Sequence, residues 1–230
     1  MNTATVAAGA TLGLEVGNHV PQNYKEVAIS GLALCAGLIG VRMFLQSKNA
    51  IVVVASVALG GVLGMALGIA GGVDSFAEWC RQRLGGGSTF NEGLITTSVL
   101  FCVGPMTLLG CLQDGVEGKI DLLAIKSTLD GIGAFFFAAT LGAGVLVTAG
   151  IVLVFQGAIT LAARSLQRLA KDEQLLAETS AVGGALMLGI SINMLNLRSL
   201  RMETYLPALV LAPCFVWLAR KLEARKEETV

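Results

Sequence analysis

Residues 50–72 read AIVVVASVALGGVLGMALGIAGG, a stretch of apolar and small residues without a charged side chain. Because about 20 such residues in a helix cross the hydrocarbon core of a bilayer, this stretch predicts a transmembrane helix. Glycine recurs in it at every fourth position, which places these glycines on one face of the helix. A face of small residues lets a neighbouring helix approach closely, and this is typical of helix bundles in lipid.

Similar apolar stretches recur along the whole chain. Seven of them are separated by short charged or turn-rich segments, at about residues 3–17, 27–45, 50–72, 93–112, 131–155, 178–197 and 204–219. The first is shorter than a perpendicular crossing requires, so six spans and a half-helix are the alternative. The sequence therefore predicts an all-α fold, a polytopic transmembrane helix bundle of about seven segments that forms one membrane domain over residues 1–230.

The overall composition agrees with a membrane protein and excludes other classes. Hydrophobic residues make up 54% of the chain and charged residues only 14%, with a mean hydropathy of +0.74, whereas soluble domains carry about 25% charged residues. The formal net charge is zero, so we expect no nucleic-acid partner. One histidine and five cysteines without ligand-like spacing predict no metal site and no cofactor. For the same reason we do not expect an enzyme.

The distribution of basic residues predicts an orientation in the membrane. With seven spans and the N-terminus outside, ten Lys and Arg residues fall on the inside, Arg220 among them, and six on the outside, Lys48 among them. The positive-inside rule then places the C-terminus in the cytoplasm. Because neither Lys nor Arg precedes Lys25, we interpret the first segment as a retained helix and not as a signal peptide.

Two glycine ladders are predicted to be helix-packing faces. They comprise Gly9, Gly13 and Gly17 in the first segment and Gly60, Gly64, Gly68 and Gly72 in the third. Close contact with other helices is the expected role, and a glycine-lined path for a substrate is the alternative. A weak echo between the second and sixth segments also suggests a three-helix repeat, with halves 1–72 and 131–219 joined by residues 73–130 and arranged in parallel.

The fourth segment contains the strongest candidate for a functional break. Gly104 and Pro105 lie in the middle of residues 93–112, where proline leaves at least one backbone carbonyl without its helical donor. Broken helices within a bilayer are tolerated where protein or a watery cavity satisfies the backbone, and in transporters they often form the substrate site. An ordinary proline kink is the alternative.

Polar residues near this break complete the candidate site. In the connector after the fourth segment, which we interpret as a short interfacial or re-entrant helix, Lys126 and Asp130 are four residues apart and are expected to pair on one face. This pairing leaves Asp114 free to act at the mouth of a cavity. Gln156 and Asn193 lie near the ends of later spans, where they either bond a neighbouring helix or line a permeation path.

The order of several short motifs resembles a known family. These motifs are Leu100–Met106, Gly110 with Asp114-Gly115, Lys126-Ser127 with Asp130-Gly131, Gln156-Gly157, Ala181–Gly184 and Leu206–Ala208. Together they resemble the YqgA-like family of bacterial membrane proteins, known as domain of unknown function 554, over nearly the whole chain. The resemblance implies a location in the bacterial inner membrane and supplies no activity.

From these observations we expect a small transporter or channel-like carrier of an ion or small solute. A membrane scaffold or assembly subunit that acts through the glycine faces is the alternative. The expected partners are the lipid bilayer and an ion or small solute, and self-association into a homo-oligomer stays open.

Overall fold

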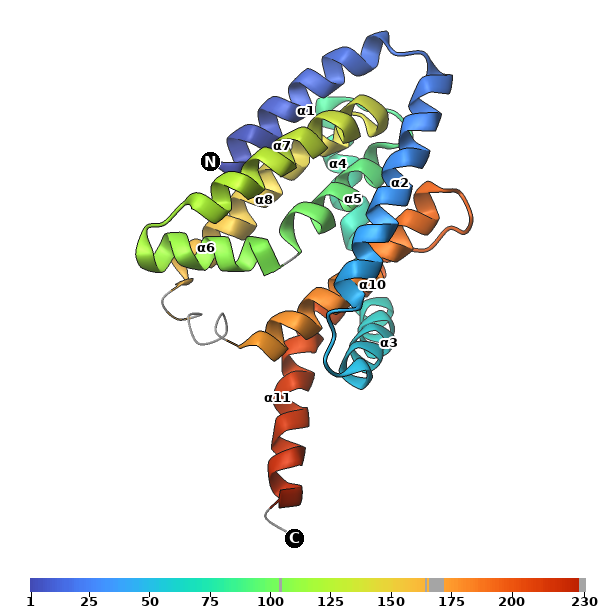
Figure 1. The fold of residues 1–230 in the computed structure, drawn as a ribbon. Coiled ribbons are helices and arrows are strands. Elements are labelled where there is room, and N and C mark those ends of the chain that lie inside the picture. The colour runs from blue at the N-terminus through green and yellow to red at the C-terminus, as the bar shows by residue number, and fades with distance from the viewer. Residues whose placement is uncertain (104, 164, 166–171, 228–230) are drawn as a thin grey trace.

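The computed structural model describes residues 1–103, 105–163, 165 and 172–227, and these residues form helices without any strand. The elements are, in chain order, α1 (Asn2–His19), α2 (Gln22–Phe44), α3 (Ala50–Ala66), α4 (Ile69–Leu84), α5 (Phe90–Cys102), α6 (Pro105–Glu117), α7 (Asp121–Leu141), α8 (Gly144–Leu161), α10 (Glu173–Met194), the 3-10 helix η1 (Met202–Tyr205) and α11 (Pro207–Glu227). The predicted helix bundle is confirmed, and Figure 1 shows how the helices are arranged.

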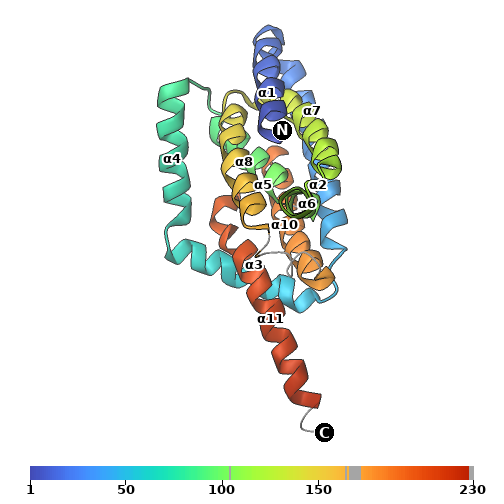
Figure 2. The ribbon, with the colours of Figure 1, turned by 90° about the vertical axis from the view of Figure 1, so that its left-hand side faces the viewer.

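The number of candidate membrane spans agrees with the prediction, although the spans are not the same ones. Within the described residues, five segments, among them α2 and α10, are long and apolar enough to cross a membrane. Two bent pairs raise the number to seven if each is one span: α3 with α4 at 67°, and α5 with α6 at 56°. In Figure 2, α3 runs across the bundle and α4 turns to run along its side, where Ala77 and Cys80 pack with residues of α5. Helix α1, which corresponds to the first predicted span, is not among these candidates.

The expected single span over residues 131–155 is wrong, because a turn divides it. Gly142, with a φ of 85°, ends α7, and α8 begins at Gly144. Such a φ suits glycine, which has no side chain to clash with the backbone. The interpretation of residues 121–130 as a separate interfacial or re-entrant helix is also wrong, since they form the first half of α7. Lys126 and Asp130 therefore belong to a helix of the bundle.

The first glycine ladder packs α1 directly onto α7. A Cβ atom at Gly9, Gly13 or Gly17 would collide with the backbone carbonyl oxygens of Gly131, Phe135 and Ala139, respectively. Since both sets of residues ascend by four, the two helices run in the same direction. The predicted close packing of this ladder is confirmed, and it fixes the position of α1 relative to α7.

The second ladder follows the prediction only in its first half. Cβ atoms at Gly60 and Gly64 would collide with the backbones of Ala208 and Thr204, so these two glycines pack α3 against α11 and η1. Gly68 adopts a left-handed conformation, with a φ of 64°, between α3 and α4, and a Cβ atom at Gly72 would meet nothing within 4 Å. The prediction of one continuous face is wrong, because the helix ends before Gly68.

The two predicted halves contact each other through corresponding helices. The largest interfaces join α1 to α7, α2 to α10 and α3 to α11. In the second pair, Gly37 faces Ser191 and Gly40 faces Gly184, so α2 and α10 run in opposite directions. A parallel repeat predicts that corresponding helices run in the same direction. The pair α1 and α7 does so and the pair α2 and α10 does not. The division into halves stays a prediction.

Contacts at the start of α10 correct the predicted assignment of loops. Lys48 pairs with Glu173 at 3.0 Å, and Arg220 donates a hydrogen bond of 2.6 Å to Asp172. Since Asp172 and Glu173 are neighbours, Lys48 and Arg220 lie at the same end of the bundle and not on opposite sides. Hydrogen bonding to Arg220 also lowers the pKa of the Asp172 carboxyl below its ordinary value.

Candidate functional site

The break between α5 and α6 leaves a backbone carbonyl that side chains satisfy. Gly104 lies outside the described residues, and Pro105 begins α6. In a continuous helix the carbonyl of Phe101 would accept from the N–H of residue 105, which proline lacks. The Thr107 hydroxyl donates to this carbonyl instead at 3.1 Å, and the Gln156 amide does so at the longer distance of 3.5 Å. The predicted loss of a backbone donor is thus observed.

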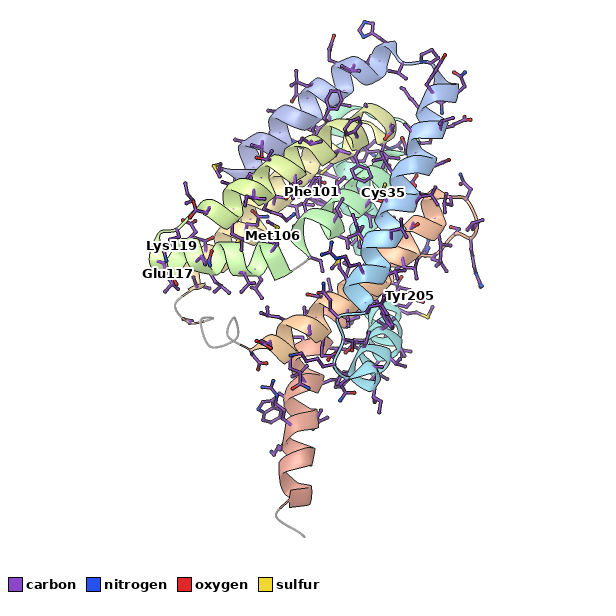
Figure 3. All side chains as sticks on the ribbon, viewed as in Figure 1. Cys35, Phe101, Met106, Glu117, Lys119 and Tyr205 are labelled. Carbon is purple, nitrogen blue, oxygen red and sulfur yellow. The ribbon has the colours of Figure 1, made fainter. Side chains whose placement is uncertain are left out.

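An ion pair on α7 lies beside this carbonyl. Lys126 donates a hydrogen bond to Asp130, with 2.5 Å between Nζ and Oδ1, as their spacing of four residues predicts. Both residues are less than a tenth exposed. The Lys126 ammonium also lies 5.7 Å from the centre of the Phe101 ring, which is within the range of a cation–π contact. In Figure 3, Phe101 lies inside the bundle, whereas Glu117 and Lys119 lie at its edge.

Asn2 and Gln156 complete the polar cluster. The Asn2 amide donates to Asp130 Oδ2 at 2.8 Å and to Gln156 Oε1 at 3.1 Å. Asn2 occupies this position because the glycine contacts of α1 hold its first turn against α7. We call these groups the Lys126 cluster: Asn2, the Phe101 carbonyl, Thr107, Lys126, Asp130 and Gln156.

The Lys126 cluster is electrically balanced and enclosed by protein. Burial of a lone charge in a bilayer is costly, but here the ammonium and carboxylate neutralise each other and both carboxylate oxygens accept hydrogen bonds. A second cation can replace Lys126 at Asp130 only if the ammonium moves or releases its proton. An anion can bind Lys126 only if it competes with Asp130. The geometry thus couples the binding of a charged solute to the state of this ion pair.

Two of the predicted site residues lie outside this cluster. Asp114 is partly buried on α6, and its side chain makes no hydrogen bond or ion pair with another described residue. Asn193, near the end of α10, donates to the carbonyl of Leu200 at 2.6 Å and accepts from its N–H at 2.7 Å. The structure brings together Lys126, Asp130 and Gln156 beside Pro105, and it places Asp114 and Asn193 elsewhere.

Several polar residues of these sites were not predicted. Asn2 is one, since neither spacing nor a motif connects it with Asp130, and Thr107 is another. A third is Glu178, which is fully buried and accepts from the Ser47 hydroxyl at 2.6 Å and from the Lys48 N–H at 2.8 Å. An acidic residue inside an apolar helix was the available signal for Glu178. These bonds give it a structural role, which is to hold the loop between α2 and α3 against α10.

Two cavities lie along α5. An apolar cavity of about 470 Å³ lies along the middle of the helix, where Ser98, Val99 and Cys102 are among its lining residues. A polar hollow of about 400 Å³ lies at the start of the helix and includes Glu92, Thr96 and Asn193 in its lining. Ile95 lines both of them. In the part of the chain that the structure describes, His, Cys, Asp and Glu residues form no group of three that could hold a metal ion.

The fold and site define a class: a polytopic α-helical membrane protein with a broken helix beside a buried, charge-balanced polar cluster. The chain belongs to the family described as "Protein of unknown function (DUF554)", whose model matches residues 1–217. It is 26% identical over 221 residues to the "Uncharacterized membrane protein YdfK" of Bacillus subtilis, covering 94% of each chain. It is also 26% identical over 218 residues to the "Uncharacterized protein YqgA" of Escherichia coli, covering 92% of each. No solved structure matches the chain.

Proposed function

We propose that this protein is a small carrier of an ion or small solute and that the Lys126 cluster is its binding site. The observation that carries the proposal is a buried ion pair at a helix break, joined by side chains from two further helices. Ionisable groups within membrane helices are rare and commonly mark substrate or ion pathways. Broken helices supply the polar backbone groups that such pathways use.

Each residue of the cluster has a role in this proposal. Asp130 binds a cationic group or a proton, and Lys126 is the internal cation that takes its place when the site is empty. Gln156 and Thr107 hold the Phe101 carbonyl in position next to the site where the solute and the Lys126 ammonium replace each other. The apolar cavity supports a path to this site, because Cys102 and Val103, which directly follow Phe101, are among its lining residues.

Flux through proteoliposomes tests this function. We would reconstitute the full chain and follow sodium-22, rubidium-86 and internal pH after imposing a gradient of each ion. We expect saturable flux of at least one probe in the wild type and a loss of at least tenfold in Asp130→Asn. Asp114→Asn, which makes the same chemical change outside the cluster, should retain flux.

Two results would reject the carrier. One is flux in Asp130→Asn equal to that of the wild type, and the other is the absence of flux for every probe in a correctly inserted wild type. Insertion and folding would be checked by gel filtration in mild detergent.

The scaffold alternative gains little support from the glycine faces. Gly9, Gly13, Gly17, Gly60 and Gly64 already contact helices of the same chain, so a partner would have to use other surfaces. Co-purification in mild detergent separates the two functions, because a stoichiometric second protein favours a scaffold and a lone homo-oligomer favours the carrier. We propose no enzymatic activity.

We further propose that the chain resides in the bacterial inner membrane with its C-terminus in the cytoplasm. The end of α11 carries Arg220, Lys221, Arg225 and Lys226, and the sequence that joins α8 to α10 adds Arg164, Arg168 and Lys171. Basic residues next to membrane helices favour the cytoplasmic side. Labelling of single cysteines placed at each terminus of a cysteine-free variant would test this orientation.

A further inference from the structure

The polar hollow at the start of α5 contains a carboxylate that forms no hydrogen bond or ion pair with another described residue. Glu203 in η1 is only 7% exposed and lines this hollow. Among the described residues, no other residue donates a hydrogen bond to its carboxylate. The backbone N–H that acts on the carboxylate is that of Glu203 itself. Arg201 and Asp74 act on it electrostatically in opposite directions. No buried side-chain oxygen or nitrogen of the described residues lacks a hydrogen bond, so the Glu203 oxygens are open to the hollow, where a ligand can reach them.

Two further oxygen-bearing side chains face the same hollow. Thr96 is 1% exposed, and its hydroxyl has no hydrogen bond to another described residue. Glu92, four residues earlier on α5, is half-buried and lines the hollow as well. Residues four apart lie on one face of a helix, so both point the same way. The hollow thus brings two carboxylates and a hydroxyl from α5 and η1 to one polar space.

The chemistry of this lining favours a positively charged group. Carboxylate and hydroxyl oxygens are ligands of hard metal ions, and they also accept hydrogen bonds from ammonium groups. An anion would meet two carboxylates, while the positive residue in the lining, Arg198, is itself exposed to solvent. The volume of about 400 Å³ is in the range of small-molecule sites and leaves room for a hydrated ion or a small amine.

We infer that this hollow is a binding site for a cationic group, supplied by a metal ion or an organic amine, with Glu203, Glu92 and Thr96 as its ligands. The site is separate from the Lys126 cluster, which lies at the opposite end of α5 and contains its own cation. The inference does not depend on transport, since a bound cation at this position would exist in a carrier or in a scaffold.

The test is a binding measurement on the purified full-length protein in detergent. The melting midpoint would be followed by tryptophan fluorescence during separate titrations with sodium chloride, magnesium chloride and methylammonium chloride. A ligand that binds the folded state raises the midpoint in a way that depends on its concentration. We expect a saturable rise with at least one probe, and the probe that acts identifies a metal ion or an amine as the source.

Matched variants assign the binding to this hollow. Glu203→Gln and Glu92→Gln keep the size of the side chain and remove its charge, and we expect each to raise the half-saturating concentration at least tenfold. Glu173→Gln is the control, because Glu173 is exposed and begins α10, about 30 Å along the helix axis from Asn193. It should titrate like the wild type.

Two results would overturn the inference. The first is the absence of a saturable rise with all three probes in the wild type. The second is a rise that persists unchanged in both Glu203→Gln and Glu92→Gln, since this would be a general effect of salt. The use of two variants keeps the test decisive if one of them does not fold, and a carrier that shows flux without binding here would leave the proposed function intact.

Discussion

Asp130 and Glu203 are both buried residues, which are 4% and 7% exposed, but their carboxylates differ in the partners around them. Asp130 receives the ammonium of Lys126 and the amide of Asn2. Glu203 receives no hydrogen bond from another described residue and faces a polar hollow. The comparison shows that burial alone does not define a site, because a carboxylate paired with an internal cation and one that faces a polar hollow are different chemical situations.

The difference has an energetic meaning. In the Lys126 cluster, removal of one charge leaves the other buried without its counter-charge, so the two groups depend on each other. At Glu203, removal of the charge breaks no hydrogen bond or ion pair with another described residue, and only the electrostatic attraction of Arg201 is lost. Stability should therefore respond strongly to changes at the first site and weakly to changes at the second.

The largest effect is expected for Lys126→Met. This variant leaves Asp130 buried without its cation, and we expect the free energy of unfolding to fall by about 3–5 kcal/mol. Denaturant titration in detergent, followed by tryptophan fluorescence, would measure it.

The double variant Lys126→Met/Asp130→Leu is the control for that loss. It removes both charges, and Asn2 and Gln156 can still bond each other, so most of the lost stability should return. A double variant as unstable as the single one would show that packing, and not pairing, governs this position.

An intermediate effect is expected for Gln156→Leu. The change removes the longer of the two hydrogen bonds to the Phe101 carbonyl and leaves one N–H of the Asn2 amide without its acceptor, and a buried unsatisfied donor costs about 1–3 kcal/mol. The same unfolding measurement applies. Gln113→Leu, at an exposed position on α6, is the matched control and should change stability by less than about 0.5 kcal/mol. Equal losses in the two variants would contradict the role of Gln156.

The smallest effect is expected for Glu203→Gln without added cation. Since the carboxylate has no hydrogen bond from another described residue to lose, the free energy of unfolding should stay within about 1 kcal/mol of the wild type. A loss as large as that of Lys126→Met would mean that Glu203 has a structural partner in the fold. That result would remove the contrast between the two carboxylates.

The two glycine ladders show where pattern reasoning succeeded and failed. Both have the same spacing, yet Gly9 and Gly13 pack closely whereas Gly68 forms a turn. Spacing predicts one face only while the helix continues, and α3 ends at Ala66, before Gly68 takes its left-handed conformation. The division of residues 131–155 at Gly142 has a similar cause, since an apolar sequence with glycine is compatible with a helix or with a tight turn between two helices.

The sequence by itself determined the membrane helix bundle, the break at Pro105 and the pairing of Lys126 with Asp130. Each depends on local chemistry: apolar length, a missing N–H, or four residues along one helix. Only the tertiary structure decided that Asn2 joins the cluster, that Asp114 lies outside it, and that Glu203 faces a hollow. These placements depend on how helices distant in sequence pack together, and no local spacing records that.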